Sequence, residues 1–103
     1  MPDINDLLMP SIEQYYPGDE RWERFVNFYR KKLTDFTSIS ILSAKLDHHE
    51  DLSIVILGLM GDENSISYIE TKMDILEGLS PIECLQSENL IKRLKVALLR
   101  YPV

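Results

Sequence analysis

Large apolar side chains recur at steps of three and four positions from residue 19 onward, which is the spacing of one face of an α-helix. They are Trp22, Phe25, Val26, Tyr29, Leu33 and Phe36. Charged residues fall on the other side of this segment, and Asp19 is a suitable N-cap. We therefore expect an amphipathic helix whose aromatic face packs into the core of a small, mainly α domain. A partner-binding stripe is the alternative for this face.

The last third of the chain carries several helix start signals. Asp62 is placed to cap a helix that runs to about Thr71. The run Ser80-Pro81-Ile82-Glu83 combines a capping box between Ser80 and Glu83 with proline at the first helical position. Ser87 is a second N-cap, and the apolar stripe that follows it predicts a final amphipathic helix ending before Pro102. That stripe consists of Leu90, Ile91, Leu94, Ala97, Leu98 and Tyr101.

Residues 37–60 allow two interpretations. The stretch from Leu52 to Met60 is apolar almost throughout, so its periodicity does not separate a buried strand from a buried helix. A β-hairpin connected by Asp47 to Asp51 would make the fold α+β. We favour a helix that stops at Gly61 and keep the short hairpin as the alternative.

Length and composition favour one domain over residues 1–103. We divide it into an arm over 1–18, where Pro2, Pro10 and Pro17 limit any helix, a helical half over 19–56, and a second half over 57–103. The net charge of −6 makes nucleic acid an unlikely partner. Cys84 is the only cysteine, no signal peptide is recognisable, and the longest apolar run is too short for a membrane span, so we expect a cytoplasmic protein without membrane contact.

No catalytic motif is visible, so we expect neither an enzyme nor a cofactor. The cluster Asp47-His48-His49-Glu50-Asp51 contains metal-ligating residue types, but adjacent histidines point in different directions, and a solvated turn is the favoured interpretation over a metal site. Cys84 lies among apolar residues without a nearby base, which indicates a core residue. The final helix is basic through Lys92, Arg93, Lys95 and Arg100, which suits either the helix dipole or an acidic partner.

The second half also resembles a known family. The residues that carry the resemblance are Leu57 to Glu63, Tyr68 to Thr71, Ile75 to Leu85 with its Ser-Pro-Ile-Glu-Cys-Leu turn, and Leu90 to Leu99. In order and spacing they are similar to the toxin-binding domain of Xre/MbcA/ParS-type antitoxins. Tyr68 stands where that family usually has tryptophan. The helix-turn-helix that often precedes this domain is not recognisable in the first half.

The resemblance implies a helical bacterial antitoxin, often a homodimer, that binds and neutralises a RES-type toxin which consumes NAD. It also implies that the closing helix and tail occlude the toxin's active site. The partner-binding residues would be Tyr68, Leu76, Pro81, Arg93, Leu99, Arg100, Tyr101, Pro102 and Val103. The alternative function is an orphan helical interaction or regulatory module without a toxin partner.

Overall fold

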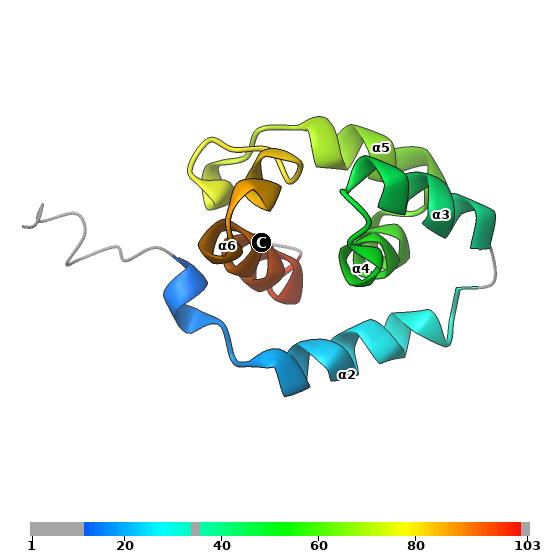
Figure 1. Ribbon diagram of the computed structural model, residues 1–103, viewed down its shortest axis with the longest axis horizontal. Helices are drawn as coiled ribbons and strands as arrows, with labels where there is room; N and C mark the ends of the chain where they lie inside the picture. Colours follow the sequence, from blue (N-terminus) through cyan, green and yellow to red (C-terminus); the bar gives the residue numbers. More distant parts are fainter. Residues whose placement is uncertain (1–11, 34–35, 102–103) are drawn as a thin grey trace, which may run out of the picture.

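The computed structural model describes residues 12–33 and 36–101. Within them, five α-helices and three short 3-10 helices follow one another, and an isolated bridge between Met73 and Leu79 is the only β pairing. The elements are η1 (Ile12–Tyr15), α2 (Asp19–Arg30), α3 (Phe36–Lys45), α4 (Glu50–Met60), α5 (Asp62–Glu70), η2 (Asp74–Leu76), η3 (Glu83–Gln86) and α6 (Glu88–Leu99) (Figure 1). The mainly α fold that the sequence predicted is therefore confirmed.

Helix α4 is the centre of the core. Every side chain from Leu52 to Leu57 is buried, because α2, α3, α5 and α6 all pack against it. An apolar helix without a polar face is stable only when it is surrounded in this way. The hairpin alternative for residues 37–60 is consequently wrong, since this segment forms α3 and α4. They are joined by a turn in which Asp47 and His48 have left-handed backbones, with φ of 54° and 65°.

Helix α2 is shorter than the predicted aromatic segment. It ends at Arg30, and Phe36 begins α3 instead of continuing the same helix. Gly18 is the N-cap and Asp19 is the first helical residue, so the predicted cap is displaced by one position. The aromatic face does pack inward, because Trp22 and Val26 are each 1% exposed. Core packing of this face is thereby confirmed.

Two close contacts hold α2 against α4. The indole Nε1 of Trp22 donates a hydrogen bond to Oδ2 of Asp51 at 2.8 Å. Two turns further along α4, the Tyr29 ring lies directly against Gly58, where a Cβ atom would overlap the ring. Glycine at position 58 therefore allows the two helices to approach closely.

The predicted caps of the second half are largely present. Ser80 N–H donates to Oε1 of Glu83 at 3.0 Å, and Glu83 N–H donates to Oγ of Ser80 at 3.3 Å, which completes the capping box. Ser87 Oγ accepts from Leu90 N–H at 3.2 Å at the start of α6. Helix α5 starts at Asp62, but Gly61, with φ of 81°, is its N-cap and also the C-cap of α4.

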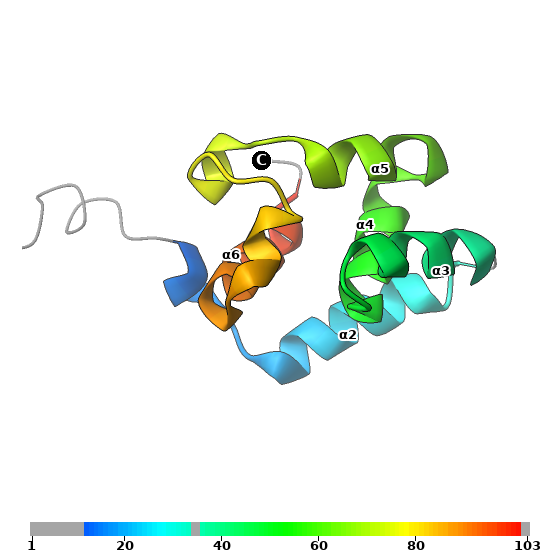
Figure 2. The ribbon, with the colours of Figure 1, turned by 45° about the horizontal axis from the view of Figure 1, so that its top comes forward.

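Helix α6 lies between η1 and the turn segment of residues 73–79 in both ribbon views (Figures 1 and 2). The part of the predicted arm that the structure describes, η1, packs directly against α6. Residues 1–11 of that arm lie outside the described residues. No helix among the described residues is long and apolar enough to cross a membrane.

Candidate functional site

Helix α6 is anchored through its apolar face and leaves its C-terminal end at the surface. Leu94, Ala97 and Leu98 are buried in the core, which fixes the rotation of the helix. After Leu99 the backbone N–H of Arg100 still donates to the Val96 carbonyl, so Arg100 continues the helical direction for one residue. Arg100 and Tyr101 are exposed, and Tyr101 retains 43% of its accessible surface. The chain therefore exposes the Arg100 guanidinium and the Tyr101 ring at the C-terminal end of the anchored helix α6.

The surface around this end is concave. A hollow of about 230 Å³ is lined by Tyr15, Pro17, Arg21, Val96, Leu99 and Arg100. The guanidinium of Arg100 lies 5.3 Å from the centroid of the Tyr15 ring, within the range of a cation–π contact. Residues from η1, α2 and α6 thus share one surface, which we call the α6-end surface and define by Tyr15, Arg21, Leu99, Arg100 and Tyr101.

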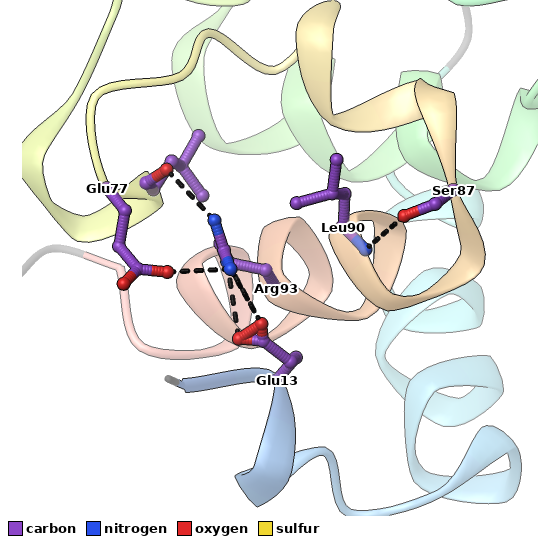
Figure 3. A network of polar contacts seen from close by, with 6 residues as sticks. Glu13, Glu77, Ser87, Leu90 and Arg93 are labelled. Atoms are coloured by element: carbon purple, nitrogen blue, oxygen red, sulfur yellow. Dashed lines mark hydrogen bonds and ion pairs between the residues drawn. The ribbon is translucent and has the colours of Figure 1, made fainter. Parts of the chain in front are cut away.

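Arg93 has a different environment from the other cations of α6. Its Nη2 lies 2.9 Å from Oε2 of Glu13 and 2.6 Å from Oε2 of Glu77, and its Nη1 donates to the Leu76 carbonyl at 3.4 Å (Figure 3). The Arg93 side chain is only 14% exposed. Hydrogen bonding to Glu13 raises the pKa of Arg93, so the charge is permanent. Arg93 therefore joins η1, the 73–79 turn and α6 in the free protein.

The structure separates the predicted partner-binding residues into two groups. Leu76 and Pro81, both predicted to bind a partner, are buried, so neither is accessible at the surface of this chain. Leu99, Arg100 and Tyr101 lie together at the end of α6. Pro102 and Val103 lie outside the described residues.

Tyr68 lies near Tyr101. It is partly buried in α5, and burial, with a smaller contribution from nearby Tyr101, raises the pKa of Tyr68 to about 12. Its phenol is consequently neutral at physiological pH and lies close enough to Tyr101 to interact electrostatically. Tyr68 can therefore support the Tyr101 side of the α6-end surface.

Three contributors to this region, Glu13, Tyr15 and Arg21, were missed from the sequence. Tyr15 and Glu13 reach α6 only because η1 folds back on it, and residue spacing gives no signal for a contact between positions 13 and 93. Arg21 carried a usable signal, because it lies on the opposite side of α2 from the buried Trp22 and Val26 stripe.

The residues around His48 and His49, and Cys84, have contacts that indicate structural roles. Asp47 and His48 form an exposed turn, Glu50 pairs with Arg30 at 2.9 Å, and Asp51 accepts the Trp22 hydrogen bond. No group of three metal-ligating side chains occurs in residues 12–33 and 36–101.

Cys84 is fully buried, as the sequence predicted, and burial raises the pKa of its thiol to about 11. A thiol of that pKa is a poor nucleophile near neutrality.

Comparison with known proteins leaves the family open. We found no significant match to any protein-family model, curated protein or solved structure.

Proposed function

We propose that the chain is an antitoxin-like protein that binds a partner toxin through the α6-end surface and acts by occlusion, without chemistry of its own. The observation that carries this proposal is the pairing of a deeply anchored helix with an exposed Arg100 and Tyr101 at its end. Arginine and tyrosine are among the residues that most often dominate interface energies. A rigid helix loses little conformational entropy when its end inserts into a cleft.

The partner class follows from the resemblance of the second half to Xre/MbcA/ParS-type antitoxins. A RES-type toxin binds NAD in a cleft, and an arginine beside an aromatic ring is chemically suited to a pocket for a phosphate-bearing, aromatic ligand. Neutralisation would then require only that Leu99, Arg100 and Tyr101 enter the cleft mouth. The cytoplasm, where NAD is available, is the compartment in which we place this interaction, and a homodimer remains part of the proposal.

The direct experiment is co-expression of the full chain with a RES-domain toxin. We expect a stoichiometric complex that survives gel filtration and restores cellular NAD. The proposal is wrong if the RES-domain protein depletes NAD equally with and without this chain. A chain that forms no complex but self-associates would support the orphan interaction module instead.

A further inference from the structure

Helix α2 carries a second surface feature, which overlaps the α6-end surface at Arg21. Five of the chain's 11 Lys and Arg residues lie between positions 21 and 32, although the protein as a whole has a net charge of −6. Arg21, Arg24, Phe28 and Lys31 follow one another at steps of three and four, so they form a stripe on one side of the helix. All four side chains are exposed, and Phe28 retains 52% of its surface.

The cations of this stripe form no ion pair with other described residues of the protein. In residues 12–33 and 36–101, the basic residues with ion pairs are Arg30, Lys72, Arg93 and Lys95. The side chains of Arg21, Arg24 and Lys31 make no ion pair or hydrogen bond within those residues. Lys32 adds a further positive charge, with its Nζ 4.2 Å from the centroid of the Phe28 ring. The stripe cations are thus unpaired although the chain has surplus acids, whereas Arg30 of the same helix pairs with Glu50.

The surface beside these cations is hollowed and partly apolar. One hollow of about 390 Å³ is lined by Arg21, Arg24, Phe25, Phe28 and Leu99. A second of about 530 Å³ is lined by Arg24, Asn27, Phe28, Lys31 and Lys32. They share Arg24 and Phe28, and no acidic residue lines either one. We call these two adjoining hollows together the α2 channel.

We propose that the α2 channel is a docking site for an acidic peptide segment of another protein, with one large apolar side chain seated against Phe25, Phe28 and Leu99. The eleven helical steps from Arg21 to Lys32 span roughly 16 Å at about 1.5 Å per residue. An extended peptide of about five residues covers this distance. Three or four carboxylates along it would meet the four cations, while the apolar anchor fills the hollow that a purely ionic ligand would leave empty.

Charge favours this occupant over a long polyanion such as nucleic acid. The net negative charge of the rest of the chain would repel such a polyanion. A short peptide places its few negative charges only beside the α2 cations. The α2 channel shares Arg21 and Leu99 with the α6-end surface, but the Arg100 and Tyr101 side chains do not line it. Substitutions at Arg100 and Tyr101 therefore test the antitoxin proposal separately from this one.

The test uses the full chain and an array of ten-residue synthetic peptides in which the number of Asp or Glu residues and the presence of a central Leu or Phe vary independently. We expect binding to require both features and to weaken as salt is raised. The tightest peptide is then titrated by fluorescence anisotropy. The double variant Arg24→Glu/Lys31→Glu should weaken its binding by about tenfold or more, and Phe28→Ala should also weaken it.

Matched controls lie elsewhere on the molecule. Lys45→Glu/Lys92→Glu makes the same charge change outside the α2 channel, and Ile41→Ala truncates a side chain that is 53% exposed on α3. Both should bind the peptide as the wild type does, and so should Arg100→Ala/Tyr101→Ala. The proposal is overturned if acidic peptides bind no better than their Lys-substituted counterparts, or if the channel and control variants weaken binding equally. It is also overturned if a ten-nucleotide oligo-dT binds more tightly than any peptide, or if Arg24→Glu/Lys31→Glu dissociates a homodimer.

Discussion

Arg93 of α6 and Glu13 of η1 form a two-point ion pair across 80 positions of sequence, with Nε to Oε2 at 3.1 Å and Nη2 to Oε2 at 2.9 Å (Figure 3). Each side chain is only 14% exposed. Because Glu77 and the Leu76 carbonyl contact the same guanidinium, three segments converge on it. This contact defines the position of η1, and hence of Tyr15, beside the end of α6.

We expect Glu13→Gln to lower the free energy of unfolding by about 1–3 kcal/mol, because it leaves a largely buried guanidinium with one carboxylate fewer. Urea denaturation followed by circular dichroism measures the change. Glu20→Gln, at an exposed position of α2, is the matched control and should change stability by less than about 0.5 kcal/mol. Equal effects of the two substitutions would show that the Glu13 to Arg93 pair contributes nothing to stability.

Gly58→Ala should destabilise the protein although alanine is the better helix former by about 1 kcal/mol. The added Cβ would overlap the Tyr29 ring and push α2 away from α4. Thermal unfolding of the variant should therefore occur at a lower temperature than that of the wild type. Tyr29→Leu in the same chain should recover part of the loss, and a Gly58→Ala variant that is more stable than wild type would contradict the close packing.

The capping box gives a pH dependence. Hydrogen bonds from the backbone of Ser80 and from Lys72 lower the pKa of Glu83 below its ordinary value of 4.5. A carboxyl with a lowered folded-state pKa stabilises the protein above its unfolded-state pKa, and this stabilisation is lost as the pH falls through the folded-state pKa. NMR titration should find the Glu83 pKa below 4.5 and partly restored towards that value in Lys72→Met. A Glu83 pKa above 4.5 would contradict the box.

Cys84 should react slowly with a thiol reagent in the native protein. A pKa raised from 9.0 to about 11 reduces the thiolate fraction about 100-fold, and the side chain is fully buried. The reaction with Ellman's reagent at pH 8 should therefore be at least about 100-fold slower than in concentrated guanidinium chloride. Equal rates under the two conditions would contradict the burial of Cys84.

Capping residues and apolar spacing predicted most of the helices. The candidate site depends on contacts between segments that are distant in sequence, which local patterns do not predict. Ser80, Glu83 and Ser87 lie where their caps were predicted, because capping is decided within four residues of chain. The break after Arg30 was missed, because apolar spacing continues through Leu33 and Phe36 across two different helices. The apolar run in α4 has no polar positions that would reveal a helical or strand periodicity, because all of its faces are buried. Its secondary structure could therefore not be predicted from the pattern.

The candidate site was predictable only in part. The exposure of Arg100 and Tyr101 follows from their position at the end of an amphipathic helix. This part of the α6-end surface was therefore predictable from the sequence. The burial of Leu76 and Pro81 and the pairing of Arg93 with Glu13 depend on how distant segments meet. Phe28 was predictable in principle, because it lies one residue before Tyr29 and so points away from the inner face of α2.

The affinity of the full chain for a RES-domain toxin, measured by isothermal titration with wild-type and Arg100→Ala/Tyr101→Ala chains, tests the account most directly. We expect the double variant to keep the fold and lose at least about 2 kcal/mol of binding free energy, roughly 30-fold in Kd. Ile41→Ala/Lys45→Ala, which truncates an exposed apolar and a basic residue on α3, should bind like the wild type. Undiminished binding by the Arg100→Ala/Tyr101→Ala chain would show that the end of α6 is not the partner-binding surface.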